Sequence, residues 1–428
     1  MPFEPLPPEP LSPRPAPPRR RPVAHALSRL LRRLGLVQRP ALDDLSRRIL
    51  LPSLPVSDEE HARAHHHRAG QCLARQEDWN ILAARVIEAD HRRWHTPAGE
   101  TVASLLAQGA RADLVAAAED AIADGRAPDG AGLDALEMVQ AEDPGCYPLA
   151  LVVALAHMDI GRAWRARAGD AQARRRGEQA FLEHFARAEA LLEPFDPEAR
   201  DAPSIAAAQC ALLAARPAPR RRVADDYARL IALDPGAPGP LRALGEALLP
   251  ERFGSFDELD LEARRAAVRT AEIWREGGYA WVWFDALTRD PAGLAVVDPA
   301  FFCDGLRAIA ENRPDQHVIN QLAAFCGLVM APGTEKPRLA PAQERARRAI
   351  HACLDWLVAE HLHELHPLVW TQALIGPGQS ADLPPRRMLV QRGRQAALHA
   401  IAARFADEIA EGQTLAFSSA GMYRLSTP

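Results

Sequence analysis

Histidine and cysteine side chains gather in one stretch of the chain at spacings that suit a transition-metal site. In residues 57–95, "SDEEHARAHHHRAGQCLA" is followed by "QEDWNILAARVIEADHRRW", and the two halves predict an antiparallel helical hairpin. His61, His65 and Cys72 then share one helix face, and His91 lies at the same depth as His61. Imidazole and thiolate groups bind zinc and related metals, so His61, His65 and His91 are candidate metal ligands.

A second histidine motif, "AEHLHELHP", occupies residues 359–367. Glu360 precedes His363 by three residues, a spacing that di-iron helical bundles use on two of their helices, and Glu88 and His91 repeat it. His363 is therefore a fourth metal candidate. An exposed polar helix face produces the same pattern, so a metal-binding or enzymatic protein that uses the histidines at 61–95 or 361–366 is the alternative function.

Other catalytic patterns are missing from the sequence. It contains no Gly-x-Ser-x-Gly nucleophile elbow and no glycine-rich phosphate loop ending in lysine and serine. The six cysteines include no Cys-x-x-Cys pair, which argues against both a disulfide scaffold and a structural zinc site. We therefore name no catalytic residue and expect no cofactor.

Aromatic residues concentrate in "GGYAWVWFDAL", residues 277–287. On a helix, Trp281 and Phe284 share one stripe that Thr288 closes, while Trp283 and Leu287 form a second stripe. A helix that is apolar on two sides fits a middle layer of stacked helices, so core packing is the main interpretation.

A concave groove is the alternative setting for these aromatic residues, because large rigid rings anchor peptides well. Tyr279 is the one aromatic that we expect at a surface, since its hydroxyl prefers water or a partner. Tyr279, Trp281 and Arg242 are the candidate partner-binding residues. We expect Gly277 and Gly278 to break the chain between two helices.

The composition predicts a nearly all-α protein, because alanine, leucine, arginine and glutamate outnumber β-branched and aromatic residues. Ser57 suits the N-cap of the first helix, with its side chain accepting from the backbone of Glu60. Further helices are expected at 98–124, 130–142, 147–168, 171–192, 203–216, 220–233, 238–249, 257–276, 279–289, 298–311, 315–330, 341–364 and 385–410.

Four segments are expected along the chain. Residues 1–40 form a disordered arm rich in proline and arginine, in which 23–37 predicts a short basic amphipathic helix. Residues 41–56 form a linker, 57–412 the helical body, and 413–428 a C-terminal tail, the only segment that favours an extended conformation.

Charge is uneven between the arm and the body. Residues 1–48 hold ten arginines against four acidic residues, so they carry +6 and leave −11 for the remainder of a chain of net charge −5. The overall sign makes nucleic-acid binding an unlikely function class. The helix at 23–37 suits weak contact with a membrane surface, a partner, or the acidic body itself.

Two regions resemble the tetratricopeptide repeat, residues 61–94 and 224–267. The better match has Asp234-Pro235 at a repeat end and apolar or small residues at the family's spacing, namely Leu241, Leu244, Gly245, Leu248, Gly254, Phe256 and Leu259. The second rests on Gly70, Leu73, Trp79 and Leu82. The resemblance implies an irregular α-solenoid of stacked helix hairpins that binds a protein or peptide.

The expected function is therefore a non-catalytic interaction scaffold. The sequence has no stretch of 18 apolar residues, the length needed to span a membrane, and its N-terminus lacks a signal-peptide pattern. We therefore expect a cytoplasmic protein of bacterial origin.

Overall fold

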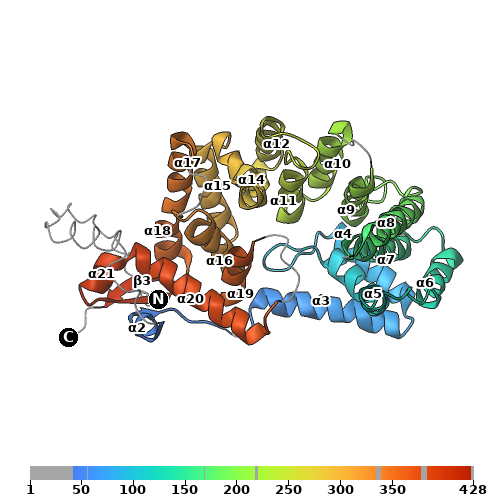
Figure 1. Ribbon diagram of the computed structural model, residues 1–428, viewed down its shortest axis with the longest axis horizontal. Helices are drawn as coiled ribbons and strands as arrows, with labels where there is room; N and C mark the ends of the chain where they lie inside the picture. The colour runs from blue at the N-terminus through green and yellow to red at the C-terminus, as the bar shows by residue number, and fades with distance from the viewer. Residues whose placement is uncertain are drawn as a thin grey trace, which may run out of the picture.

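The structure, a computed structural model, describes residues 42–54, 56–167, 169–216, 220–333, 339–376 and 383–425. The described chain is mostly helical, as its composition predicts, and it follows a curved path from the N-terminal helices to the C-terminal helices (Figure 1). The predicted arm at 1–40, with its basic helix at 23–37, lies outside the described residues.

The N-terminal region packs its helices around one hydrophobic core. Ser57 caps its first helix with the predicted reciprocal hydrogen bonds to Glu60. The core includes Leu82, Val152 and Phe181, all fully buried. The helices of this region are α3 (Asp58–Arg75), α4 (Trp79–His91), α5 (Val102–Ala123), α6 (Ala131–Glu142), α7 (Tyr147–Ala166), α8 (Ala171–Leu192) and α9 (Pro203–Ala211), followed by the short helix η1 (Leu212–Ala215).

The C-terminal region builds a second, larger core around Trp281, Phe302 and Trp370. Its first helices are α10 (Arg220–Leu233), α11 (Pro238–Ala247), α12 (Phe256–Arg269), α13 (Ala271–Trp274), α14 (Gly277–Arg289), η2 (Pro291–Ala295) and α15 (Pro299–Asn312). The remaining ones are α16 (Gln316–Ala324), η3 (Phe325–Val329), α17 (Pro341–Ala352), α18 (Leu354–Trp356), η4 (Leu357–His361), α19 (Pro367–Ile375), α20 (Arg386–Arg404) and α21 (Ala406–Ala410).

The beginning and end of the described chain meet in a small sheet. Strand β1 (Ile49–Leu50) pairs in parallel with β2 (Thr414–Ser418), which pairs antiparallel with β3 (Gly421–Leu425). The extended conformation predicted for the C-terminal tail is confirmed at β2 and β3. The prediction of a linker at 41–56 needs correction. This stretch contains helix α2 (Leu42–Arg48) and strand β1, because Leu45 and Ile49 are buried in the C-terminal core.

A second contact joins the two ends of the described chain. The backbone N–H of Leu365 donates to the carbonyl of Pro52 at 2.7 Å, and Glu60 at the start of α3 pairs with Arg386 at the start of α20. Figure 1 shows α3 and α20 at the same edge of the molecule. The helical path therefore curves until α3, near its beginning, is linked to α20, near its end.

Helix α14 lies in the middle of the C-terminal region, as the two-sided apolar pattern predicts. The break before it is at Arg275, whose φ is +49°, and not at the glycines; Gly277 and Gly278 are the first two residues of α14. A Cβ on Gly278 would lie 2.4 Å from the hydroxyl oxygen of Thr270. These glycines therefore permit close packing, and the predicted hinge is wrong by two residues.

Helix α19 was not expected from the sequence. Its residues "PLVWTQALI" are apolar on nearly every side, so the 3.6-residue alternation that indicates a surface helix is absent. Two predicted α-helices also change to π-helical geometry near their C-terminal ends. Residues 325–329 and 357–361 form π-helical turns at the ends of the segments predicted as helices over 315–330 and 341–364.

Candidate functional site

A groove lies between α11, α14, α16 and α19. Its volume is about 220 Å³, enough for one or two large side chains. The apolar part of its wall comes mainly from α14, α19 and the π-helical turn η3, through Phe284, Phe325, Val329, Val369 and Ala373. The lining runs from Arg242 to Gly376, so the groove is assembled from residues up to 134 positions apart in the sequence.

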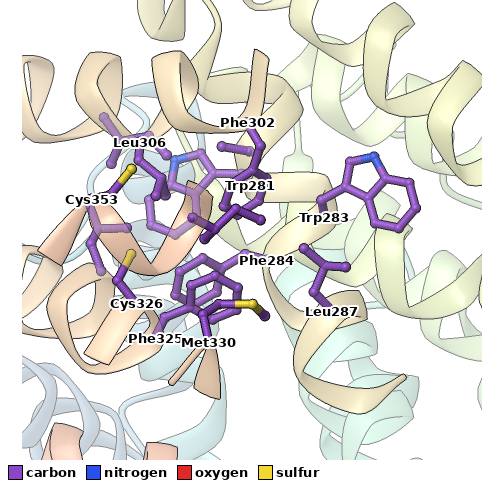
Figure 2. Close-up of a cluster of buried hydrophobic side chains, with 14 of the residues drawn as sticks. Trp281, Trp283, Phe284, Leu287, Phe302, Leu306, Phe325, Cys326, Met330 and Cys353 are labelled. Atoms are coloured by element: carbon purple, nitrogen blue, oxygen red, sulfur yellow. The ribbon is translucent and has the colours of Figure 1, made fainter. Parts of the chain in front are cut away.

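The floor of the groove rests on a rigid aromatic stack. The rings of Phe284 and Phe325 stack with centroids 4.5 Å apart and an angle of 27° between their planes. Trp281 lies beneath them and meets the edge of Phe284 at 5.6 Å (Figure 2). All three rings are at least 94% buried, so the floor cannot be remodelled without disturbing the core.

Paired charges form the rim above this floor. Arg242 of α11 donates two hydrogen bonds to Asp285 of α14, at 2.7 and 2.9 Å. The Arg242 guanidinium carbon lies 5.3 Å from the Phe284 ring centroid, in cation–π range. One turn further along α11, Glu246 accepts from Arg289 at 2.6 Å. Each charged side chain of the lining is therefore neutralised by a partner.

The close approach of α11 and α14 depends on Gly245. A Cβ at this position would lie 1.8 Å from the carbonyl oxygen of Val282, so no larger residue fits without moving a helix. Gly245 is also one of the residues that carry the tetratricopeptide resemblance. It brings Arg242 and Glu246 over the half-buried side of α14 that carries Asp285 and Arg289.

Of the three predicted partner-binding residues, only Arg242 lies in the groove. Trp281 and Tyr279 are fully buried, so the expectation that Tyr279 lies at a surface is wrong. The Tyr279 hydroxyl donates to Asp260 at 2.5 Å and accepts from the backbone N–H of Asp298 at 2.9 Å. Those two partners satisfy the hydroxyl inside the protein, and burial raises the pKa of Tyr279.

Two histidines lie beside one another at the N-terminal ends of α16 and α19, the two helices that also form one wall of the groove. His317 is one turn before Gln321, and His366 is three residues before Val369. Their ring centroids are 5.9 Å apart. Neither histidine lines the groove, but Gln321, which does, contacts His317.

The hydrogen bonds of this pair leave one nitrogen of each ring without a partner. Glu364 accepts from Nε2 of His366 at 2.8 Å, and the Gln321 amide lies 3.3 Å from Nε2 of His317. Nδ1 of both rings is buried without a hydrogen bond in the described part of the chain. Burial, followed by the neighbouring His366, lowers the pKa of His317 to about 4, so its ring is neutral at pH 7.

Two amides of α16 hold the loop that carries His366. Oε1 of Gln316 accepts from the backbone N–H groups of His363 and Glu364, each at 3.0 Å. Oδ1 of Asn320 accepts from the backbone of His366 at 3.0 Å and from Nε1 of Trp370 at 2.8 Å. The position of the histidine is therefore fixed by buried hydrogen bonds.

A related cluster occurs in the N-terminal region. Glu137 accepts from Nε2 of His157 at 2.8 Å, and Nδ1 of His157 lies 2.9 Å from Nδ1 of His184. Arg187 donates two hydrogen bonds to the same carboxylate and lowers the pKa of Glu137. Burial, followed by the neighbouring His157, lowers the pKa of His184 to about 4. In this cluster the facing nitrogens are bonded to each other.

The predicted metal candidates lie apart from both clusters. His61 and His65 are exposed on α3, and exposed His91 on α4 has its Nε2 3.3 Å from the carbonyl oxygen of Arg200. His363 is half-buried in the loop before α19. Across the described ranges, no three or more His, Cys, Asp or Glu side chains are arranged to hold a metal ion.

Sequence reasoning did not identify His317, and it named His366 only within the histidines at 361–366; it suggested a concave groove with Arg242 but not the helices that form it. His366 lies inside the motif "HELHP", but its contact with Glu364 is an i, i+2 contact that a helical interpretation rules out.

None of the helices in the described segments is both long and apolar enough to cross a membrane. No family model matches this chain, and no curated protein or solved structure matches it.

Proposed function

We propose that this protein is a non-catalytic interaction protein, and that its groove binds an uncharged peptide segment of a partner protein through one apolar side chain. The observation that carries the proposal is the groove itself, with an aromatic floor and a rim whose charges are already paired. A charged ligand would have to break one of these ion pairs, whereas an apolar side chain would only displace water.

The size and polarity of the groove support a single anchor residue. A volume of about 220 Å³ suits one leucine, methionine or phenylalanine side chain with adjoining backbone. Gln372 is exposed on the rim and its amide offers a donor and an acceptor to a peptide backbone. Small apolar pockets with a few polar groups at the rim are the usual anchor sites of peptides.

A tetratricopeptide-like origin of the helical array stays a proposal that rests on the sequence. It is supported by Gly245, which is one of the residues that carry the resemblance and which lets α11 and α14 pack closely. The cytoplasmic location likewise remains an expectation from sequence. The alternative, a metal-binding or enzymatic protein, draws little support from His61, His65, His91 and His363, which the described structure does not bring together.

A display library of random peptides provides the test, because no partner is needed in advance. We expect the peptides selected by the protein to share one large apolar residue with uncharged neighbours. Hydrogen exchange should then show that a selected peptide slows exchange in 321–329 and 369–375. Selected peptides that share a charged motif, or that protect a different part of the chain, would refute the proposal.

A further inference from the structure

Three of the six cysteines come together in the C-terminal region. Cys303 lies in α15, Cys326 in η3, and Cys353 directly follows α17. Cys326 and Cys353 belong to the C-terminal core, and Cys303 packs against it. Figure 2 shows the sulfur atoms of Cys326 and Cys353 at one side of this core. All six cysteines are free in the structure, so the fold gathers thiols that no short sequence motif joins.

Two of these thiols contact each other directly. Helices α15 and α17 pack together, and the side chains of Cys303 and Cys353 are hydrogen-bonded to each other across this contact. Cys303 is half-buried, whereas only 5% of Cys353 is exposed. The pair therefore joins a sulfur at the edge of the core to one that lies inside it.

Polar neighbours distinguish Cys353 from a cysteine that only fills space in a core. The Trp356 indole N–H donates to its sulfur, and the positive charge of Arg307 acts on it. The Arg307 guanidinium carbon lies 4.2 Å from the centroid of the Trp356 ring, which holds this charge in place. The hydrogen bond from Cys303 lowers the pKa of Cys353, and Trp356 and Arg307 lower it further against the opposing effect of burial. The thiolate, which is the nucleophilic form, is thus favoured at Cys353.

The other two thiols are held in the protonated form. The hydrogen bond with Cys353, together with burial, raises the pKa of Cys303. Burial raises the pKa of Cys326. One sulfur of the three is therefore the better nucleophile, and the thiol that touches it is a proton donor. Oxidation of a cysteine pair needs this division, because one sulfur attacks the oxidant and the second displaces the product.

We propose that Cys353 and Cys303 form a reversible disulfide when the protein meets hydrogen peroxide. The Cys353 thiol loses its proton and its sulfur attacks one peroxide oxygen, so an S–O bond forms, the O–O bond breaks, and the departing hydroxide takes that proton as water. The Cys303 sulfur then attacks the sulfenic acid. An S–S bond forms, the S–O bond breaks, and hydroxide leaves with the Cys303 proton as a second water.

The burial of the pair selects the oxidant. The two thiols together lose two electrons, which the peroxide gains, and a peroxide is little larger than water. Because Cys353 is almost fully buried, such a small molecule reaches its sulfur more easily than a bulky disulfide does. This inference is independent of the groove and its ligand.

Mass spectrometry of the folded, full-length chain tests the pair. The reduced protein is treated with hydrogen peroxide, its remaining free thiols are blocked with N-ethylmaleimide, and it is digested. We expect a linked peptide pair that contains Cys303 and Cys353, that dithiothreitol separates, and that forms while exposed Cys72 is still mostly free. Cys353→Ser should abolish the link, whereas the matched control Cys326→Ala should keep it.

Two further variants keep the test valid if Cys353→Ser does not fold. Cys303→Ser should stop the reaction at the sulfenic acid, which dimedone then traps on Cys353. Arg307→Gln should slow formation of the link about 3-fold or more, because it removes the positive charge beside the thiolate, whereas Arg348→Gln on the exposed side of α17 should not. The proposal would be overturned if peroxide oxidised Cys72 before any Cys303–Cys353 link formed, or if Cys353 were linked to a different cysteine.

Discussion

Two clusters of one glutamate and two histidines occur among the described residues, one in each region, and they differ most in the contact between their two histidines. In the N-terminal cluster, Nδ1 of His157 and Nδ1 of His184 are 2.9 Å apart. In the C-terminal cluster, His317 and His366 have Nδ1 atoms that are buried and make no hydrogen bond among the described residues. The carboxylate contact, 2.8 Å to Nε2 of one histidine, is the same in both.

The difference shows which cluster is complete. Because Glu137 accepts from Nε2 of His157, Nδ1 of neutral His157 accepts from His184, and every nitrogen of His157 is satisfied. The cluster at His317 leaves two polar atoms unpaired, which costs stability unless something else offsets it. The complete cluster fastens α6 to α7 and α8, whereas the open cluster reaches the groove only through Gln321, which contacts His317. We therefore assign a structural role to the first cluster.

The largest expected effect is a loss of stability in acid that both clusters share. The pKa of His184 and of His317 is about 4, below the ordinary 6.5, so the unfolded chain binds more protons between these values. Stability should therefore fall as pH drops from 6.5 to 4, by up to about 3 kcal/mol for each region. Native-state hydrogen exchange measures the opening free energy of each region separately.

Phenylalanine variants isolate the two contributions. His184→Phe should remove the acid sensitivity of the N-terminal region alone, and His317→Phe that of the C-terminal region alone. The comparison with wild type is needed because Asp90 changes stability with pH in the opposite sense. Burial raises the pKa of Asp90 to about 6, so its protonation stabilises the folded state as the pH falls. Equal acid sensitivity in a variant and in wild type would contradict the role given to that histidine.

A smaller effect distinguishes the two clusters at pH 8, where His184 and His317 are neutral. His184→Phe removes a hydrogen bond and leaves Nδ1 of His157 buried and unpaired, so it should cost about 1–3 kcal/mol. His317→Phe removes no bond at Nδ1 and only a long contact with Gln321, so it should cost less than about 1 kcal/mol. Equal costs would show that the clusters do not differ in the way described.

The smallest effect concerns the carboxylates. Glu137 holds His157 and Arg187, whereas the side chain of Glu364 contacts only His366 in the described chain. Glu137→Gln should therefore cost about 1 kcal/mol and Glu364→Gln about half as much, measured as the urea midpoint at pH 8. The reverse order would mean that the open cluster is the more important one for stability.

Much of the helical structure could be predicted from local signals. Ser57 with Glu60, Asp170, and Asp298 before Pro299 each mark a helix start that the structure confirms with capping hydrogen bonds. The alternation of Trp281 and Phe284 with Trp283 and Leu287 also placed α14 in the core correctly. Such signals depend only on residues within one or two turns.

The features that escaped prediction depend on contacts between distant residues. Strand β1 forms because Ile49 meets Leu415, 366 positions away, and nothing near Ile49 indicates that pairing. Tyr279 is buried because Asp260 and the backbone of Asp298 satisfy its hydroxyl. The groove needs α19, whose largely apolar sequence hides its helical period. Its site residues could not be identified before the helices were placed around them.

One pair of neighbouring substitutions tests the central claim that the groove binds a peptide. Ala373 lines the groove, whereas Leu374, the next residue of α19, is 51% exposed and does not line it. A display-selected peptide should lose at least ~10-fold in affinity for Ala373→Arg, because the long side chain fills the anchor pocket, and less than ~2-fold for Leu374→Arg. Calorimetric titration of each folded variant measures both values. Equal affinity of the two variants for the peptide would contradict the account.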